Sequence, residues 1–424
     1  MSVRAGAFRP IVVLVLVALT VIVLAGCQGA TVASPSSELT PALPTGTPPP
    51  PQARDTATPD STLGPEPTWV RVTDQSSFGD SLMYAVAAGV ERYVATGEIT
   101  VGDSTLRGAI WTSTDGWTWT RVVVPSAAGA SIGGVIFDQI GYVAWGSFLS
   151  MAGTSSSAAI WTSRDGVTWR QAVGPPSFAF SEVAGIARVG DRLVAVGSSD
   201  DEDGRALVAF RAWTSTDGET WVPAGSPSIS NPDQVYVDGL AVFDGELIGW
   251  GSYDAGDRWS AAIARSPDGL HWTFEALDSA PFANPWIADV LVDGDVLVAV
   301  GGDAEEGIVV PSSAAWTSSD GVTWEPAAII DAVGDLHKVV RWGAELIALD
   351  GVPQMRSVDG RTWNRGGPGP DIEGDGQFAG ECVDGPCQFR TMLSDLAVGP
   401  AGPVAVGHTS LASGGSRSVV WILR

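Results

Sequence analysis

Apolar residues in this chain occur in short runs separated by Gly and Asp. In residues 183–197 two such runs flank the turn Gly190-Asp191, and residues 239–251 and 289–301 repeat the arrangement. Short apolar, β-prone runs on both sides of a Gly/Asp turn are typical of a β-hairpin. Beyond the N-terminal segment, no stretch keeps a 3.6-residue period over a dozen positions. The pattern therefore predicts an all-β protein.

A second pattern follows each hairpin. The motif Ser-x-Asp-Gly-x-(Thr/His)-Trp occurs six times, and its aspartates are Asp115, Asp165, Asp217, Asp268, Asp320 and Asp359. A third apolar run precedes each motif, and a fourth begins at its Thr-Trp. Each unit thus holds four short strands in about 50 residues, and four-stranded units that repeat without helices predict the blades of a β-propeller.

The two ends of the repeat complete each other. Residues 419–424 look like a third strand that stops before its Asp-Gly turn, and residues 68–72 look like a fourth strand. We therefore expect the N-terminal strand to pair with the C-terminal blade, which removes the exposed edges of a linear array. The prediction is a propeller of seven four-stranded antiparallel blades in residues 67–424, with an insertion at 364–390.

The repeated motif resembles the Asp-box, or BNR, repeat of the sialidase-like superfamily. Propellers of that kind include sialidases, endo-glucanases, sortilin-type receptors and photosystem assembly factors, so the fold does not determine the function. The resemblance implies that the six turns lie on the face away from any active site. Because a tight turn needs a residue with positive φ, and Asp and Ser can bond turn amides, we interpret the six aspartates as structural turn locks.

A sialidase would need more than this motif. The resemblance would require Arg-Ile-Pro, three converging arginines, a Tyr/Glu nucleophile pair and an acid/base Asp. The chain has no Arg-Ile-Pro, and none of its five tyrosines stands in a recognisable nucleophile context. No catalytic residue is therefore assigned. We expect a protein that binds a protein or glycan ligand without catalysis, with a sialidase-like exo-glycosidase as the alternative.

The N-terminus carries an export signal. Arg4 and Arg9 precede an apolar run at 11–24, and Leu24-Ala25-Gly26-Cys27 resembles the bacterial lipobox. The resemblance implies that residues 1–26 are a signal peptide and that Cys27 is lipidated, although an ordinary signal peptide with a chance Cys is the alternative. Residues 27–66, rich in Pro, Ser and Thr, predict a disordered tether. The protein is then extracytoplasmic and anchored to the bacterial membrane.

Charge narrows the range of partners. The chain has 48 Asp and Glu against 23 Lys and Arg, a formal charge of −25. Nucleic-acid binding needs clustered basic residues, so it is not expected. An assembly factor for a membrane complex is a second alternative, but the photosystem type presents a basic patch that this charge opposes. We expect a monomer that contacts the membrane only through its anchor.

Most of the 18 tryptophans recur at fixed positions of the repeat, which leaves Trp259 and Trp286 as plausible ligand contacts. Loops on the expected ligand face add acids, a tyrosine and arginines near them, a combination that suits a sugar or a cation. The alternative is that these loops only keep the surface soluble. The further loop candidates are Asp201, Asp203, Arg205, Tyr253, Asp257 and Arg258.

Aligning the first strands on the Gly that ends each hairpin gives another hypothesis. The position twelve residues earlier holds the single lysine of the chain, Lys338, between Asp289 and Asp395 of the neighbouring blades. Since first strands line a propeller's channel, these three residues are expected to form a polar cluster there and to be ligand candidates. An exposed strand end without contacts is the alternative.

The insertion at 364–390 contains Cys382 and Cys387, and in an exported protein such a pair predicts a small-loop disulfide. Its acidic run at 371–376 faintly resembles a calcium loop, but Cys382 stands where an EF-hand needs Glu. We assign no metal and no cofactor, with calcium kept as an alternative.

Overall fold

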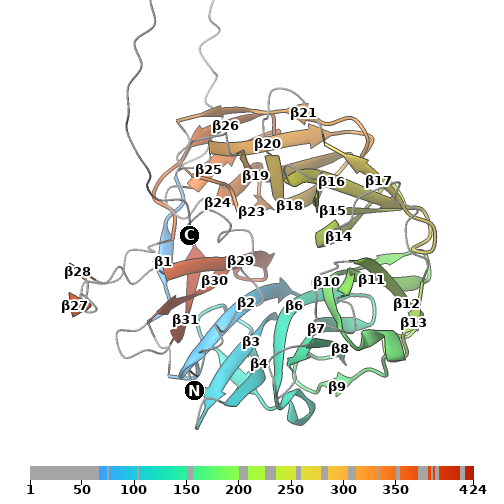
Figure 1. The fold of residues 1–424 in the computed structure, drawn as a ribbon. Coiled ribbons are helices and arrows are strands. Elements are labelled where there is room, and N and C mark those ends of the chain that lie inside the picture. The colour runs from blue at the N-terminus through green and yellow to red at the C-terminus, as the bar shows by residue number, and fades with distance from the viewer. Residues whose placement is uncertain are drawn as a thin grey trace, which may run out of the picture. The chain divides into compact units, whose positions relative to one another are not determined.

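A computed structural model shows an all-β ring of seven sheets that follow one another along the chain (Figure 1). Residues 1–65, and with them Cys27 and nearly all of the predicted tether, lie outside the residues that the structure describes. Within the described part, no helix is long and apolar enough to cross a membrane. The described residues are 66–73, 76–102, 105–149, 156–199, 209–224, 235–254, 259–277, 285–303, 312–331, 334–349, 354–370, 381–382, 385–386, 391–410 and 416–424.

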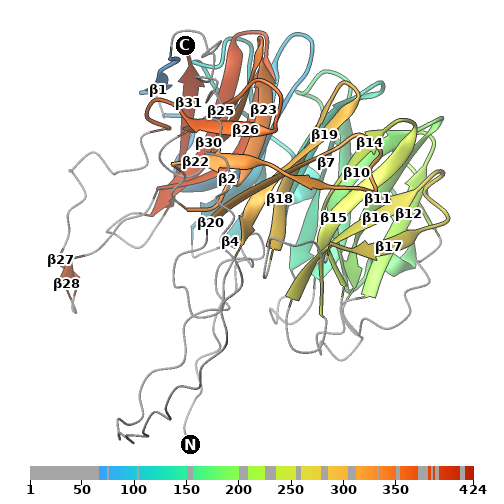
Figure 2. The ribbon, with the colours of Figure 1, turned by 90° about the horizontal axis from the view of Figure 1, so that it is seen from above.

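Each blade is a meander of antiparallel strands that runs from the ring axis outward. Seen from the side, the strands of the blades run along the ring axis, so their ends lie on two opposite faces (Figure 2). The innermost strands are β2 (Ser81–Ala88), β6 (Ala130–Asp138), β10 (Ser181–Val189), β14 (Val235–Phe243), β18 (Pro285–Asp293), β23 (Lys338–Trp342) and β29 (Thr391–Gly399). The second strands are β3 (Tyr93–Val101), β7 (Gly141–Leu149), β11 (Arg192–Ser199), β15 (Glu246–Asp254), β19 (Val296–Asp303), β24 (Glu345–Leu349) and β30 (Gly402–Ser410).

The outer half of each blade is shorter. The third strands are β4 (Thr105–Ser113), β8 (Ser156–Ser163), β12 (Ala209–Ser215), β16 (Trp259–Ser266), β20 (Ser312–Ser318), β25 (Gln354–Ser357) and β31 (Ser416–Leu423). The fourth strands are β5 (Thr120–Val122), β9 (Arg170–Gln171), β13 (Val222–Pro223), β17 (Thr273–Ala276), β21 (Glu325–Pro326), β26 (Thr362–Arg365) and β1 (Trp69–Arg71). Two single 3₁₀ turns connect blades, η1 (Pro125–Ala127) and η2 (Pro176–Phe178).

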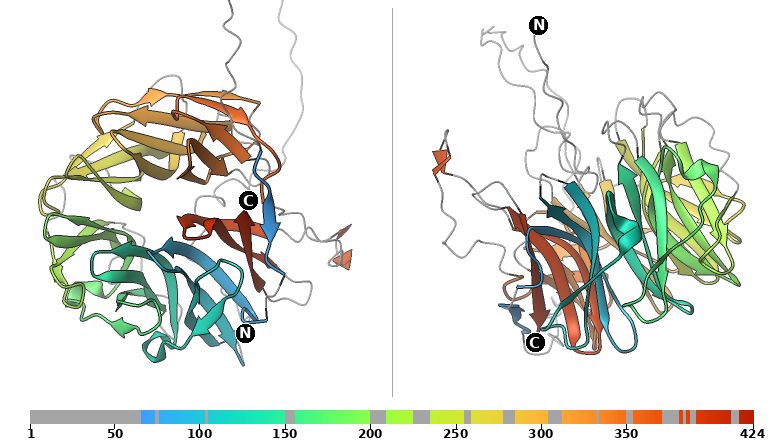
Figure 3. Two further views of the ribbon diagram at one scale, coloured as in Figure 1. Left: turned by 180° about the vertical axis from the view of Figure 1, so that it is seen from behind. Right: turned by 90° about the horizontal axis from the view of Figure 1, so that it is seen from below.

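The ring closes as the sequence predicts. Strand β1 pairs with β31, with Trp69 opposite Leu423 and Arg71 opposite Trp421. The N–H of Thr68 donates to the carbonyl oxygen of Arg424 at 2.7 Å, which extends the pairing to the last residue. Viewed from behind, β1 lies against the strands of the last blade (Figure 3). Both ends of the propeller thus share one sheet, in which β31 is paired on both sides.

Blade six departs from the predicted four strands. Its sheet gains β22 (Ala328–Ile330), which pairs in parallel with β26. The fifth strand arises because the segment leaving blade five passes beside the outer strand of blade six before it turns inward. The insertion at 364–390 contributes the hairpin β27 (Glu381–Cys382) and β28 (Gly385–Pro386). The side chain of Cys382 and all of Cys387 lie outside the described residues, so the predicted disulfide stays a prediction.

The hydrophobic core lies between neighbouring blades, and each cluster combines residues of two of them. The tryptophans at the fixed positions of the repeat are buried, and Trp111, Trp161, Trp213 and Trp421 are almost fully enclosed. The full set is Trp69, Trp111, Trp119, Trp161, Trp169, Trp213, Trp221, Trp272, Trp316, Trp324, Trp363 and Trp421. Burial of such large side chains stabilises the blade interfaces by about 2–3 kcal/mol each. The tryptophan count therefore reflects the repeated interface.

Six innermost strands contain a β-bulge at the same place. In β14 the pairing passes from Val237 to Gly239, and Asp238 is the extra residue. The Gly at the end of each hairpin is a consequence of this bulge, since a Cβ at Gly251 would collide with the carbonyl oxygen of Tyr236. The same collision would occur in the other five blades with a bulge, at Gly97, Gly146, Gly197, Gly301 and Gly407.

Candidate functional site at the centre of the ring

The six motif aspartates are occupied in the turns that contain them. In the second blade, Asp165 Oδ1 accepts the N–H groups of Val167 and Thr168 at 2.8 and 2.7 Å. Ser163 Oγ donates to the same carboxylate and accepts the N–H of Gly166 at 2.9 Å. The backbone N–H groups lower the pKa of Asp165 to about 2. This carboxylate is therefore a permanently ionised turn lock.

The same bonds recur at the other five turns. The motif serine accepts the glycine N–H at 2.8–2.9 Å in each of them. The turn glycines have φ between 69° and 76°, which a side chain would disfavour. Each turn also packs on the preceding blade, as Gly116 does against Val404 and Ile422 of the last blade. The bonds support the interpretation of Asp115, Asp217, Asp268, Asp320 and Asp359 as structural.

The structure brings the three predicted residues of the inner ring together. Lys338 Nζ lies 3.5 Å from Asp289 Oδ1 and 3.3 Å from Asp395 Oδ1, and all three side chains are mostly covered. Burial opposes the ammonium charge, but the two carboxylates outweigh it and raise the pKa of Lys338. The contact that the sequence predicts within this cluster is therefore confirmed.

Both aspartates of this cluster also hold backbone. Asp289 Oδ2 accepts the N–H of Val339 at 3.1 Å, and Asp395 Oδ2 accepts the N–H of Val86 at 2.8 Å. Each carboxylate thus reaches from its own innermost strand to the innermost strand of the next blade. The cluster joins β18, β23, β29 and β2, so a ligand would have to compete with these contacts for its polar atoms.

Asp238, which the aligned sequence positions do not single out, has different surroundings. Its side chain is exposed although Val237 and Gly239 on both sides are buried. No hydrogen bond or ion pair to its carboxylate occurs among the described residues, and desolvation by the surrounding protein raises its pKa to about 6. The sequence does contain a signal for it, one position before the residues that align with Asp289 and Asp395. At that position Asp238 is the only charged residue, and the other bulges carry Tyr84, Gly133, Ala184, Ala288 and Ser394.

Between the first two blades lies a Tyr/Glu pair that the sequence pattern does not reveal. Tyr84, at the first bulge, hydrogen-bonds to Glu98 and Ser131. Only 9% of Tyr84 and 8% of Glu98 are exposed. Burial, followed by the Glu98 charge, raises the pKa of Tyr84, so the phenol stays protonated. A Tyr/Glu contact therefore exists, but its groups are covered where a nucleophile would have to reach a substrate.

The remaining predicted ligand residues are not brought together in the described part. Trp286 is half-buried in β18, and Tyr253 packs against the core between the third and fourth blades. Trp259 begins β16, but its side chain is not among those described. Outside the described residues lie Asp201, Asp203, Arg205, Asp257 and Arg258. Where side chains are described, no group of three His, Cys, Asp or Glu could hold a metal ion.

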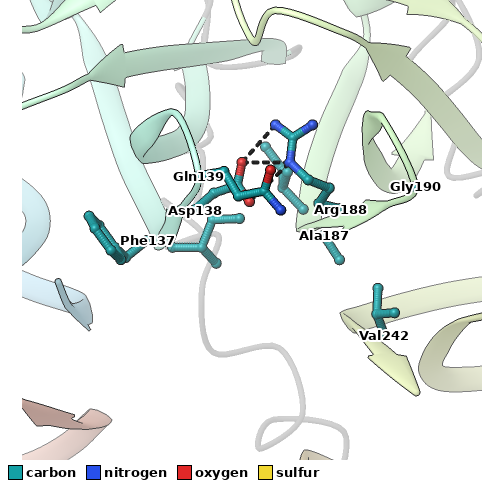
Figure 4. A pocket seen from close by; sticks show the side chains of 9 residues that line it. Phe137, Asp138, Gln139, Ala187, Arg188, Gly190 and Val242 are labelled. Carbon is teal, nitrogen blue, oxygen red and sulfur yellow. Dashed lines mark hydrogen bonds and ion pairs between the residues drawn. The ribbon is translucent and has the colours of Figure 1, made fainter. Parts of the chain in front are cut away.

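A hollow of about 500 Å³ lies where the innermost strands β6 and β10 end in the turns that lead to their second strands (Figure 4). Phe137, Val242 and Gln139 line it together with the ion pair of Arg188 and Asp138. The guanidinium donates to Asp138 from Nε and Nη2 and to the carbonyl oxygen of Asp191 from Nη1. The charged groups that line the hollow therefore already bond to each other and to backbone. An equivalent ion pair joins Arg341 and Asp293.

Comparison with known proteins finds only distant likenesses to solved structures. No family model matches the chain, and no curated protein matches it. A polysaccharide lyase, the PL25 ulvan lyase, aligns with 10% identity and a TM-score of 0.49 over 83% of this chain and 95% of its own. The WD40 domain of Neurospora crassa Pan2 aligns with 9% identity and a TM-score of 0.46 over 85% and 96%.

The alpha-L-arabinanase of Penicillium chrysogenum aligns with 15% identity and a TM-score of 0.42 over 84% of this chain and 98% of its own. At these identities and scores, the likenesses carry no information about activity. The chemistry of this protein has to be argued from its own residues.

Proposed function

We propose that this protein is an extracytoplasmic lipoprotein, anchored through Cys27, whose propeller binds a protein or glycan ligand at the centre of the ring without catalysis. A tether at 27–66 would hold the ring away from the membrane. The lipobox-like Leu24-Ala25-Gly26-Cys27 supports the anchor, and the recurring turn bonds support membership of the Asp-box, sialidase-like superfamily. No cofactor is part of the proposal, and the partner is a molecule at the cell surface.

The observation that carries this proposal is the contrast among the acids of the repeat. The turn aspartates are saturated by backbone, and Asp289 and Asp395 are paired with Lys338. Asp238 alone among the bulge residues carries a charge, and it is exposed on the innermost strand. An unpaired, partly desolvated carboxylate costs free energy unless a ligand or a proton satisfies it. That cost is typical of a binding position.

Binding is tested with the purified full chain on arrays of glycans and of cell-surface proteins. We expect a ligand whose binding weakens when Asp238→Asn is introduced and is unchanged by Asp244→Asn, an exposed turn acid of the same blade. The absence of any ligand sensitive to Asp238, or turnover of the ligand that binds, would contradict the proposal.

The alternative of a sialidase-like exo-glycosidase has one observation in its favour. Hydrolysis by two carboxylates uses one acid with a raised pKa, and that of Asp238 is about 6. Glu182 on the adjacent strand β10 offers a second carboxylate, which accepts a hydrogen bond from Ser156 at 3.1 Å. A panel of fluorogenic sialosides and other glycosides decides the question. Turnover lost in both Asp238→Asn and Glu182→Gln would favour the enzyme.

The anchor and the second alternative have separate tests. Labelled palmitate should enter the wild-type chain in cells and not the Cys27→Ala variant, which should leave the membrane fraction. An assembly factor for a membrane complex would instead co-purify with that complex in stoichiometric amount. The formal charge of −25 speaks against that alternative, because it favours neither a basic docking patch on this protein nor an acidic partner.

A further inference from the structure

The position of Asp238 determines where its carboxylate opens. One edge of β14 pairs with β15, and β14 contacts blade three through β10 and blade five through β18. An exposed side chain in the middle of this strand must therefore emerge at the free edge. Since the innermost strands surround the ring axis (Figure 1), that edge is turned toward the centre of the ring.

On the innermost strands of blades four and five, the position two residues before the bulge residue is aromatic. Tyr236 precedes Asp238 by two residues, and Trp286 holds the equivalent position on the adjacent strand β18. Both residues are half-buried. The same level carries Leu82, Ser131, Glu182 and Met392 in four other blades, so the aromatics are confined to blades four and five.

A local adjustment places the indole of Trp286. It pairs across the strands with Gly302, and a Cβ at Gly302 would overlap the indole ring. Among the five other blades with a bulge, the corresponding residues are Glu98, Ser147, Ser198, Ser252 and His408. Gly302 breaks this series, and the missing side chain leaves the room that the indole of Trp286 occupies.

The negative charge of the protein favours a cationic ligand at this position. The protein carries an excess of 25 acidic over basic side chains, which repels anions. The single lysine is held between Asp289 and Asp395, so it does not compensate Asp238. Asp238 has no cation partner among the described residues, and Tyr236 and Trp286 lie nearby in register on its own strand and on the adjacent one. Such a combination is suited to a protonated amine through an ion pair and cation–π contacts.

We propose that Asp238, Tyr236 and Trp286 form a subsite for the protonated amine of the ligand that the ring binds. This inference rests on the proposed binding function and makes its ligand class specific. Two sources would present such a group, a de-acetylated amino sugar or a lysine side chain, and the chemistry of recognition is the same for both.

Calorimetry with the full chain in detergent, at physiological ionic strength, tests the subsite. The probes are a glucosamine tetramer and its N-acetylated form, and a capped tetralysine and its Nε-acetylated form. We expect at least one amine probe to bind, and its acetylated form to bind about tenfold or more weakly, since charge-assisted bonds are lost. The sugar and peptide arms show which source the site accepts.

Variants separate the subsite from general attraction to an acidic protein. Asp238→Asn should weaken amine binding about tenfold or more, and Trp286→Leu about two- to fivefold. Asp244→Asn is the matched control, because it removes the same charge from an exposed turn of blade four, and Asn tolerates its φ of 47°. Its effect should stay below about twofold.

Three results would overturn the subsite. They are equal loss in Asp238→Asn and Asp244→Asn, equal binding of amine and acetylated probes, and no binding of any amine probe. If the acetylated glycan binds and depends on Asp238, the proposed binding function stands and only the amine inference fails. If no probe or array ligand depends on Asp238, both fail. Unfolding curves of the variants show whether a loss reflects misfolding.

Discussion

Asp165 and Asp238 belong to the same repeating framework, but their carboxylates meet opposite surroundings. Asp165 accepts two backbone N–H groups in its turn, which lower its pKa to about 2. Asp238 has no partner among the described residues, and desolvation raises its pKa to about 6. One residue recurs six times in the same role, while the other occurs once. The difference indicates where to look for function in a repeat, at positions where one blade departs from its siblings.

The difference has a local structural cause. The turn converges several N–H groups on one point, so any aspartate there is stabilised as an anion. The bulge leaves its extra residue outside the strand pairing, and blade four alone fills that position with a charge. The third case, Asp289 and Asp395, lies one residue later, where the side chain reaches the next blade. A shift of one residue therefore separates an exposed acid from a structural one.

Among the variants that test this comparison, one that removes the bulge should have the largest effect on stability. In Gly251→Ala, the new Cβ would collide with the Tyr236 carbonyl oxygen, so the bulge that presents Asp238 could not persist. We expect a loss of about 3 kcal/mol in the free energy of unfolding, measured by denaturant titration. Ligand binding should be lost with it.

The control lies on the same strand. A Cβ at Gly249 would meet Ala264 at 3.4 Å, an ordinary contact. Gly249→Ala should therefore change the free energy of unfolding by less than about 1 kcal/mol, and it should preserve binding. Equal losses of unfolding free energy in the two variants would show that Gly251 is not required by the bulge.

Removing the lysine tests the paired acids against the unpaired one. Lys338→Met leaves Asp289 and Asp395 without a cation, and we expect a loss of about 2 kcal/mol at pH 7, reduced by their partial exposure. Burial already raises the pKa of Asp289. A raised carboxyl pKa disfavours the fold above that pKa, so the loss should shrink as the pH falls from 7 to 5.

The double variant Lys338→Met/Asp289→Asn provides the check. It removes one of the two stranded charges and should recover about half of the loss in unfolding free energy. A pH-independent loss in the single variant would instead mean that packing, not charge, is what Lys338 contributes.

The fold could be predicted from the sequence because every level of it repeats. The Asp-Gly turn, the hairpin and the strand remnants at Trp69 and Trp421 each reported the same unit, and the paired register of β1 and β31 followed. The Lys338 cluster was also predictable, since strand alignment alone placed its three members at one level. In each case the chemistry was local or fixed by register.

The rest of the site could not be predicted in the same way. Asp238 matters because its neighbours are buried and it is not, and a one-residue bulge decides that exposure. Trp286 appeared as a candidate from its residue type, but only the glycine opposite shows how its indole is held. The fifth strand in blade six depends on the path of the connecting segment after Pro326, which no local pattern encodes.

The turn aspartates should affect stability without affecting binding. Asp165→Ala removes the acceptor for Val167 and Thr168, and we expect a loss of about 1 kcal/mol in the free energy of unfolding. Asp165→Asn keeps an oxygen acceptor and should lose less. Affinity for the ligand should be the same in both variants as in the wild type, and a change in affinity would remove the distinction between turn and centre.

The smallest expected effect is the sharpest test, because the two kinds of aspartate predict opposite pH dependence. The lowered pKa of Asp165 gives stability that is present above about pH 4 and lost as the pH falls toward 2. The raised pKa of Asp238 makes its ionised form unfavourable in the folded state, so its contribution improves as the pH falls below 6. Asp238→Asn should therefore unfold at slightly higher denaturant than the wild type at pH 7. The difference should shrink as the pH falls below 6 and vanish by about pH 3, where the wild-type carboxyl is protonated in both states. Denaturant midpoints across this range measure it, and a variant less stable than the wild type at pH 7 would mean that the Asp238 carboxylate has a partner in the folded protein.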